Sequence, residues 1–449
     1  MKRRIVLVDL YWTRDKDPRV PLGHASLLAS LRARIDLDVR SLVFAVNTGR
    51  LAPDAVVAAI LTEVGGLARD EVDVALSAYV WSESLVHAIV ARLRRAGFEG
   101  RIVLGGPQIS YADATMGLER LYPGVDVFIR GYAENALADV ASSPRRRDVS
   151  GVHWAGADDR AQQAAVDLDA LPSPWLTSTL SLDGQRFIRW ETQRGCPFRC
   201  SFCQHRESGV RLRRRSLALS RVDAEIDLFC RSGVDDIAVL DPVFNASPRA
   251  TEVLRRFVER GYRGRLSLQC RAESIDEPFV EAAAQLDVRL EFGLQTVHDG
   301  EGRAIERRND LARVDRSLRA VRDRGIHHEV SLIFALPTQT LASFEASVAW
   351  CLEREVPVIK AFPLMLLRGT ALDRTRDRWA LRESDAPMPM VVASSSFTEG
   401  EWQKMAALSE ALRRTEGHHP RSLRELQRLA STLDPDRARW SPADFEEVA

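Results

Sequence analysis

Short apolar segments alternate with amphipathic segments along most of this 449-residue chain, and this alternation limits the fold more than any other feature. Continuous apolar segments suit parallel strands that are covered on both faces, and the amphipathic segments between them suit the covering helices. The pattern therefore predicts an α/β fold. Residues 146–185 interrupt this alternation. They show no strong hydrophobic period and contain turn-forming segments such as Leu171-Pro172-Ser173-Pro174. We expect two α/β units joined by a linker at 146–185.

The first expected unit, residues 1–145, is a doubly wound parallel sheet. Its predicted strands are Ile5–Leu10, Val74–Ala78, Arg101–Leu104 and Val125–Ile129, and its predicted helices are His24–Arg34, Pro53–Val64 and Ser84–Ala96. Sheets of this kind bind ligands at the carboxyl ends of their strands. The paired glycines Gly105-Gly106 follow one such end and would let the backbone approach a flat ligand, although they also suit a tight turn without a ligand.

The second expected unit, residues 186–372, repeats strand and helix six times. The predicted strands are Phe187–Glu191, Asp236–Leu240, Leu266–Cys270, Val288–Phe292, Glu329–Phe334 and Val358–Phe362. This repetition predicts a parallel barrel or partial barrel with its chemistry at the carboxyl ends of the strands. Residues 373–449 are predicted to form a short helical tail, with helices at Gly400–Glu416 and Ser422–Thr432.

Three cysteines follow the first strand of the predicted barrel. Cys196, Cys200 and Cys203 have the spacing C-x3-C-x2-C. Three thiolates in one loop can bind three irons of a cubane cluster, which leaves the fourth iron open to a small molecule. Two other interpretations remain, a Cys3His zinc site that uses His205 and three buried structural thiols.

The cysteine loop resembles the signature of the radical S-adenosylmethionine (radical SAM) enzymes, including the aromatic Phe202 before the last cysteine. The resemblance implies that the amino and carboxylate groups of SAM chelate the fourth iron of a 4Fe–4S cluster. It also implies reductive cleavage of SAM to a 5′-deoxyadenosyl radical, which abstracts hydrogen from a small-molecule substrate. The electron would come from an external donor of the flavodoxin or ferredoxin type, or from a partner reductase. Radical SAM domains resemble a partial (β/α)6 barrel, and the predicted strand count matches.

Polar side chains gather where the predicted barrel strands end. They are Asp241, Arg271, Glu273, Glu291, Gln295, Thr296 and Ser331. Glu273 or Glu291 would suit the ammonium of SAM, and Arg271 would suit its carboxylate. Ser331, Thr296 or Gln295 would suit the ribose hydroxyls, and Phe202 would give apolar cover to the adenine. The segments 291–296 and 332–340 resemble cofactor-contacting strands of the family, whereas Asp241-Pro242-Val243-Phe244-Asn245 replaces its usual glycine-rich stretch.

The first unit resembles the cobalamin-binding-type domain that precedes many radical SAM domains. The matching segments are Pro21-Leu22-Gly23, Tyr79-Val80-Trp81, Leu104-Gly105-Gly106-Pro107 and Asp126–Gly131. The motif D-x-H-x-x-G, which supplies a histidine to cobalt in some cobalamin proteins, is absent, and Tyr11-Trp12-Thr13-Arg14-Asp15 follows the first strand instead. Either the domain binds cobalamin without a lower histidine, or it remains as a scaffold after the cofactor was lost.

Two reactions fit these features. The favoured one is radical dehydration or deoxygenation of an aminosugar, with Asp241, Glu291 and His205 as acid–base candidates. The analogue for this reaction is the radical SAM diol-dehydratase of aminoglycoside antibiotic biosynthesis, which acts on a paromamine-like aminosugar. The alternative is a cobalamin-dependent C-methyltransferase of natural-product biosynthesis. A remote third is an iron–sulfur electron carrier, which would normally supply four thiolates per cluster.

The composition limits the classes of binding partner and the cellular compartment that we expect for this protein. The formal net charge is +0, which gives no argument for electrostatic capture of nucleic acid. No apolar run reaches membrane-spanning length. The other cysteines, Cys230, Cys270 and Cys351, are scattered singly and predict no disulfide framework. We therefore expect a cytoplasmic protein in a reducing compartment.

Overall fold

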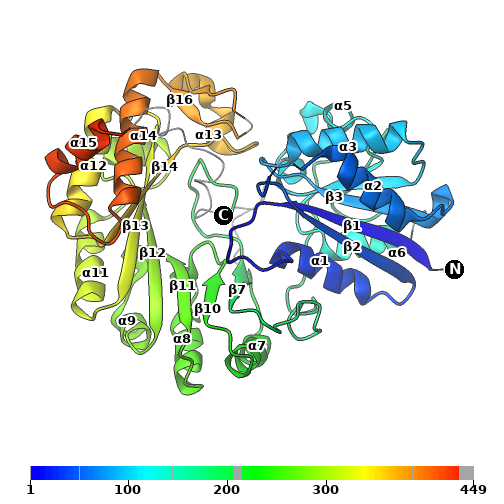
Figure 1. Cartoon of the computed structure of the whole chain (residues 1–449), viewed down its shortest axis with the longest axis horizontal. Coiled ribbons are helices and arrows are strands. Elements are labelled where there is room, and N and C mark those ends of the chain that lie inside the picture. Colours follow the sequence, from blue (N-terminus) through cyan, green and yellow to red (C-terminus); the bar gives the residue numbers. More distant parts are fainter. Residues whose placement is uncertain (1, 50, 144, 206–214, 387, 434–449) are drawn as a thin grey trace. The chain divides into compact units, whose positions relative to one another are not determined.

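The computed structural model describes residues 2–433 apart from 50, 144, 206–214 and 387, in two units (Figure 1). The first unit ends at Gln185 and the second begins at Arg186. Among the helices of the described residues, none is long and apolar enough to cross a membrane.

The first unit contains a six-stranded sheet in the order β2-β1-β3-β4-β5-β6. Its strands are β1 (Arg3–Tyr11), β2 (Leu37–Ala45), β3 (Val72–Ser77), β4 (Arg101–Gly105), β5 (Val127–Ile129) and β6 (Val152–Trp154). Its helices are α1 (Leu22–Arg32), α2 (Pro53–Val64), α3 (Glu83–Arg95), α4 (Pro107–Ser110), α5 (Leu118–Leu121) and α6 (Glu134–Ser142). Helices α2 and α3 pack together over one apolar core and α1 and α6 over another, so the predicted doubly wound sheet is confirmed.

Two strands of this sheet differ from the sequence-based expectation. Strand β2 lies at the edge and pairs only with β1, and the charged residues Asp38 and Arg40 interrupt its apolar pattern. Strand β6 lies within the segment expected to be a linker and pairs antiparallel with β5. Ala164 also bridges to Gly131. The segment from 146 to 185 therefore contributes a strand and a bridge to the first unit.

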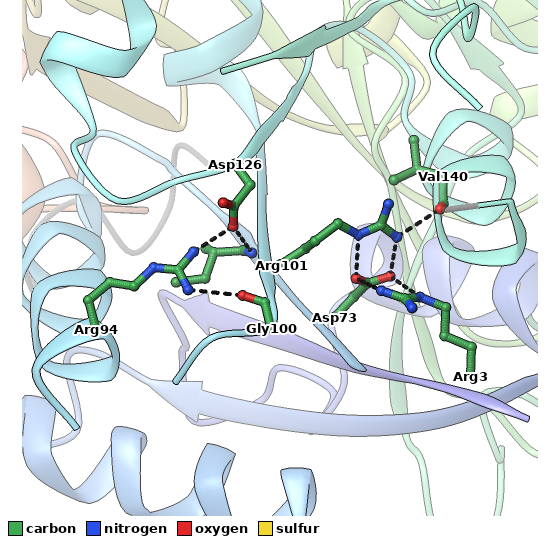
Figure 2. Close-up of polar contacts among 8 residues, drawn as sticks. Arg3, Asp73, Arg94, Gly100, Arg101, Asp126 and Val140 are labelled. Carbon is green, nitrogen blue, oxygen red and sulfur yellow. Dashed lines mark hydrogen bonds and ion pairs between the residues drawn. The ribbon is translucent and has the colours of Figure 1, made fainter. Parts of the chain in front are cut away.

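The amino ends of the first unit's strands are joined by ion pairs (Figure 2). Asp73 is fully buried at the start of β3 and accepts hydrogen bonds from Arg3 Nη2 at 2.6 Å and from Arg101 Nε and Nη2, both at 2.7 Å. Asp126 accepts from Arg94 at 2.5 Å and from the backbone N–H of Ile102 at 2.7 Å. These contacts tie β1, β3, β4 and β5 together where the strands begin, which we call the amino edge of the sheet.

The second unit contains a parallel six-stranded sheet in the order β14-β13-β12-β11-β10-β7. Its strands are β7 (Phe187–Trp190), β10 (Asp236–Val239), β11 (Arg265–Cys270), β12 (Asp287–Gln295), β13 (His327–Phe334) and β14 (Val358–Pro363). The outer helices are α7 (Leu219–Arg231), α8 (Ala250–Glu259), α9 (Glu277–Ala283), α11 (Leu311–Asp323) and α12 (Leu341–Glu353). Because β7 and β14 lie at opposite edges, the barrel is partial, as predicted.

Alternation along the barrel strands separates an apolar face from a polar one. Trp190 packs edge-on against Phe229 of α7 and Phe257 of α8, so its face of β7 meets the helices. Along β12 the buried residues are Val288, Leu290, Phe292 and Leu294, whereas Arg289, Glu291 and Gln295 alternate with them and are only partly buried. The sheet therefore turns polar side chains toward the concave side of the barrel.

The tail folds into α14 (Glu399–Arg414) and α15 (Leu423–Ser431), in agreement with the predicted helices, and residues 434–449 lie outside the described residues. The predicted tail also contains a hairpin of β15 (Arg382–Glu383) and β16 (Val391–Ala393), which the sequence did not suggest, and α13 (Ala371–Arg374) lies at its start. The tail covers the edge strand β14. Ser409 donates to the Ala361 carbonyl at 2.6 Å, and the Ile359 N–H donates to His419 Nε2 at 2.9 Å. These bonds use backbone groups of the edge strand β14 that could otherwise pair with another strand.

Candidate active site at the carboxyl ends of the barrel strands

The cysteine loop leaves the barrel just after β7, through the short strand β8 (Gln193–Arg194), which pairs with β9 (Arg215–Ser216). Asp241, at the end of β10, holds this exit. It is fully buried and accepts hydrogen bonds from the Thr192 N–H at 2.8 Å, the Gln193 N–H at 3.1 Å and the Thr192 hydroxyl. Burial raises the pKa of Asp241 to about 7 even though these donors oppose the shift.

The middle of the loop is attached to two distant segments. The Ser201 N–H donates to the Ile305 carbonyl, and the Leu372 N–H donates to the Ser201 carbonyl, both at 2.9 Å. Gln204 Nε2 also donates to the Arg368 carbonyl at 2.8 Å. The loop is therefore held by the segment after α10 (Asp299–Ala304) and by the segment that begins α13.

All three cysteines of the loop are free thiols, and two of them are buried. Burial raises the pKa of Cys196, and it raises the pKa of Cys203 to about 12. Such thiols become thiolates only when a positive charge compensates for desolvation, as the irons of a cluster would. A buried guanidinium also lies beside them, with Arg307 Nη1 3.7 Å from Cys200 Sγ. The donor set fits a cubane cluster bound through three cysteines.

Among the described residues, no three His, Cys, Asp or Glu side chains are arranged to hold one metal ion. A cubane cluster does not need that arrangement, because each thiolate binds a separate iron. The other loop residues named from the sequence lie close to the cysteines in the chain. Phe202 is half-buried, and His205 is exposed with its backbone N–H 3.3 Å from Cys203 Sγ.

Arg271 and Glu273 lie together at the end of β11. The Arg271 guanidinium stacks 4.1 Å above the Phe198 ring of the cysteine loop and donates to Glu273 Oε2 at 3.3 Å. Asn245 holds the Arg271 backbone through two hydrogen bonds, of 2.8 and 2.9 Å. Arg271 and Glu273, two of the three residues predicted to bind the charged groups of SAM, are thus paired with each other, and Arg271 contacts the loop.

Strands β12 and β13 carry the remaining predicted residues. Glu291 lies opposite Gln269 and Glu329 on the neighbouring strands, and Ser331 lies opposite Gly293. Gln295 adopts a left-handed backbone conformation, φ +69°, where the strand pairing shifts register. Gln295 thus lies at the carboxyl end of its strand, whereas Glu291 and Ser331 lie farther inside theirs, and the contacts of all three with SAM stay a prediction.

Thr296 belongs to a buried network that the sequence did not suggest. Its hydroxyl donates to Glu301 Oε2 at 2.5 Å, and Gln339 Nε2 donates to the same oxygen at 3.1 Å. The network joins the loops that follow β12 and β13, so the Thr296 hydroxyl is engaged within the protein. Glu301 and Gln339 gave no separate sequence signal, because their contacts span 38 residues.

Arg307 is the other residue that the sequence analysis missed. It lies in the charged run Glu306-Arg307-Arg308-Asn309-Asp310, which has the composition of a solvated surface. In the structure, however, Arg307 is buried, and its guanidinium contacts a cysteine 107 residues earlier in the chain. The contact forms only when distant barrel segments come together, so no local sequence pattern predicts it.

The carboxyl edge of the first unit's sheet holds an aromatic pair and buried titratable groups. Tyr79 and Trp81 stack with their ring centroids 4.5 Å apart, and Trp81 Nε1 donates to the Leu10 carbonyl at 3.1 Å. Asp9 is buried on β1, one residue before Leu10, and burial raises its pKa to about 6. His24 lies with Nδ1 3.9 Å from Asp9 and Nε2 2.8 Å from the Ser41 hydroxyl.

Comparison with known proteins places the barrel in a family. Residues 190–351 match the family profile of the Radical SAM superfamily. The cobalamin-dependent radical SAM methyltransferase TokK of Streptomyces tokunonensis is 27% identical over 328 residues, which cover 67% of this chain and 47% of TokK. The 2-(S-pantetheinyl)-carbapenam-3-carboxylate methyltransferase of Streptantibioticus cattleyicolor is 28% identical over 375 residues, covering 73% and 54%. The chain thus spans about half the length of these two relatives.

The fold is similar over a larger share of the chain. The radical SAM methyltransferase TsrM from Kitasatospora setae, solved with cobalamin and a 4Fe–4S cluster bound, matches with a TM-score of 0.68 and 18% identity. The match covers 90% of this chain and 85% of TsrM. All three of these proteins are methyltransferases, so the comparisons do not support the favoured prediction of aminosugar dehydration. Residues 190–351, which include the three-cysteine loop, thus carry the similarity to the Radical SAM superfamily.

Proposed function

We propose that this protein is a cobalamin-dependent radical SAM C-methyltransferase that acts on a small molecule. The main support is the similarity of both units, over 90% of the chain, to a radical SAM methyltransferase whose structure contains cobalamin. The sequence relatives support the same proposal, because one of them is named as cobalamin-dependent and both as methyltransferases.

The carboxyl edge of the first unit's sheet suits a large, flat ligand. The stacked rings of Tyr79 and Trp81 offer a planar surface, and the turn Gly105-Gly106 lies after β4. A side chain at Gly106 would meet the Ala78 backbone at 2.7 Å, so the turn is packed closely against the end of β3. Thr13 and Asn47 exchange hydrogen bonds of 2.9 and 2.7 Å and fix the loop after β1. No histidine in the D-x-H-x-x-G position is available, so cobalamin would bind without that ligand.

The barrel residues would bind and orient the reactants. When bound, the cluster and SAM supply the 5′-deoxyadenosyl radical that activates a substrate carbon. Asp241 orients the exit of the cysteine loop, and the Arg271–Glu273 pair meets the loop through Phe198. Glu291, Gln295 and Ser331 supply hydrogen-bonding groups on the concave face for SAM or substrate.

Two partners follow from this proposal. An external one-electron donor of the flavodoxin or ferredoxin type would be needed, because reductive cleavage of SAM consumes one electron that SAM itself does not supply. The substrate is a small polar biosynthetic intermediate with a carbon that can lose hydrogen.

The proposal is tested by anaerobic reconstitution with iron and sulfide, with and without hydroxocobalamin. We expect a stoichiometric corrin absorption band, and products of candidate substrates heavier by one methyl group that carries the label of methyl-labelled SAM. Cys200→Ala is the control, since it should keep the corrin band and lose methylation. Turnover without cobalamin and with loss of water would instead restore the dehydratase hypothesis.

A further inference from the structure

We infer that Arg307 is a positioning residue for the cluster, which holds a positive charge against the Cys200 sulfur and thereby favours the reduced cluster. The inference concerns the electron-accepting step of the radical SAM reaction. It does not depend on whether the product is methylated.

The geometry around Arg307 directs its guanidinium to the cysteine loop. Nη1 lies 3.7 Å from Cys200 Sγ, and Nη2 donates to the Gly293 carbonyl on β12. The backbone is held as well, because the Arg307 N–H donates to the Gly302 carbonyl at 2.7 Å. A side chain at Gly302 would meet the Arg307 carbonyl at 2.6 Å, so this turn requires glycine. The guanidinium is thus oriented from two sides.

The burial of Arg307 requires a nearby negative charge. The side chain belongs to a residue that is 7% exposed, and its Nε is buried without a hydrogen-bond partner. Among the described residues, its hydrogen bonds go to a carbonyl oxygen and a sulfur rather than to a carboxylate. A buried cation without a counter-charge is unfavourable. A thiolate bound to a cluster would provide that charge.

Neighbouring arginines do not share this arrangement. Arg271 is paired with Glu273, and Arg303, four residues before Arg307, pairs with Asp299 on the surface. Arg307 therefore contributes an uncompensated positive charge beside the cysteine loop. When the cluster takes one electron, its negative charge increases, and a cation near a ligand sulfur stabilises the reduced form more than the oxidised form. Arg307 should therefore raise the reduction potential.

The test is an EPR-monitored redox titration of reconstituted protein without SAM, using dithionite as the one-electron donor and mediator dyes. We compare Arg307→Gln, Arg307→Lys and, as a matched control, Arg303→Gln. For Arg307→Gln we expect an about tenfold lower ratio of reduced to oxidised cluster at a fixed potential, which is a downward shift of about 59 mV for a one-electron couple. Arg307→Lys should shift less because it keeps the charge, and Arg303→Gln should titrate like the native protein.

Iron and sulfide contents are measured on every variant, so that a loss of cluster is not read as a change of potential. If Arg307→Gln loads poorly, Arg307→Lys must still load and show a smaller shift in the same direction. An unchanged midpoint in a fully loaded Arg307→Gln protein would overturn the inference, as would loss of the cluster from both Arg307 variants while Arg303→Gln retains it. A failure to find methylation would not affect these readouts.

Discussion

Two buried aspartates on opposite edges of the first unit's sheet have very different surroundings. At the amino edge, Asp73 is fully buried and receives four hydrogen bonds from Arg3 and Arg101 (Figure 2). At the carboxyl edge, Asp9 is 5% exposed, and its carboxylate is hydrogen-bonded by the Leu10 backbone and by the Ser77 hydroxyl at 3.5 Å, with His24 Nδ1 at 3.9 Å. One carboxylate is compensated by two cations, whereas burial raises the pKa of the other to about 6.

The difference separates a buried carboxylate that stabilises the fold from one that is buried at a cost in stability. A fully paired carboxylate joins strands, and removing it leaves buried cations. A buried carboxylate with weak partners lowers stability and is typical of binding edges. Asp241 at the barrel mouth is an intermediate case, since it accepts three hydrogen bonds and burial still raises its pKa to about 7.

The largest expected effect comes from the cysteine loop. Cys200→Ala removes one iron ligand, so we expect complete loss of the visible iron–sulfur absorbance and no cleavage of SAM to 5′-deoxyadenosine. The free energy of unfolding of the metal-free protein should barely change. Cys351→Ser, a change at a buried cysteine outside the loop, should keep the cluster. Cleavage of SAM by Cys200→Ala would contradict the assignment.

At the amino edge of the first unit's sheet, we expect a substitution to lower stability. Asp73→Ala leaves Arg3 and Arg101 without their shared counter-charge, and we expect a loss of about 3–5 kcal/mol in the free energy of unfolding. The measurement is urea denaturation followed by circular dichroism. Asp70→Ala, at an exposed position three residues earlier, should change stability by less than about 0.5 kcal/mol. Equal losses of stability in Asp73→Ala and Asp70→Ala would contradict the stabilising role of the Asp73 ion pairs.

Asp9 gives a pH-dependent test of the carboxyl edge. Its pKa is about 6 in the folded protein, compared with 3.8 for an unperturbed aspartate, so the folded state binds the proton more tightly than the unfolded chain does. Stability from this group is therefore present below about pH 4 and is lost as the pH rises to about 6. Asp9→Asn should become more stable than the native protein across this window, by up to about 3 kcal/mol at pH 7.

His24, which faces Asp9, also titrates in this pH range, so the variant must be compared with the native protein at each pH. Burial lowers the pKa of His24 to about 4, which makes the native protein lose stability as the pH falls from about 6.5 to 4. Ser77 does not titrate, and burial raises the pKa of Tyr79 out of this range. Only the difference between Asp9→Asn and the native protein isolates Asp9. A difference that does not vary with pH would show that Asp9 is normally solvated.

The smallest effect is expected at Asp241. Asp241→Asn replaces one acceptor oxygen with an N–H2 group facing the donors of Thr192 and Gln193. We expect a loss of about 1–3 kcal/mol in stability and a lower iron content after reconstitution. Asp235→Asn, at a half-exposed position just before β10, is the control. Normal loading by Asp241→Asn would mean that the carboxylate does not orient the cysteine loop.

The alternation of apolar strands and amphipathic helices was enough to predict both parallel sheets, because buried strands such as β3 and β4 are continuously apolar. The edge strand β2 was missed because it pairs on one side only and carries Asp38 and Arg40. Strand β6 was missed because three residues are too few for a period. Its pairing with β5 is instead secured by the close approach of Gly151 to Ala164.

For the site, the three cysteines could be singled out from the sequence because they lie within eight residues of one loop. The partners of that loop were not predictable. Strand ends drew attention to Asp241 and Arg271, but only the folded barrel shows that Asp241 binds the Thr192 and Gln193 backbone. Arg307 is the clearest case, since it approaches Cys200 across 107 residues of chain.

The attachment of Ser201 to Ile305 and Leu372 has a consequence for how the protein matures. The loop that carries the cysteines gains its anchors only after the chain has closed over separations of 104 and 171 residues, and contacts of such range form late in folding. A nascent or truncated chain that lacks Leu372 would present the three thiols without their final spacing. Iron–sulfur loading would then act as a checkpoint, because stable acquisition of the cofactor would report that the whole barrel is complete.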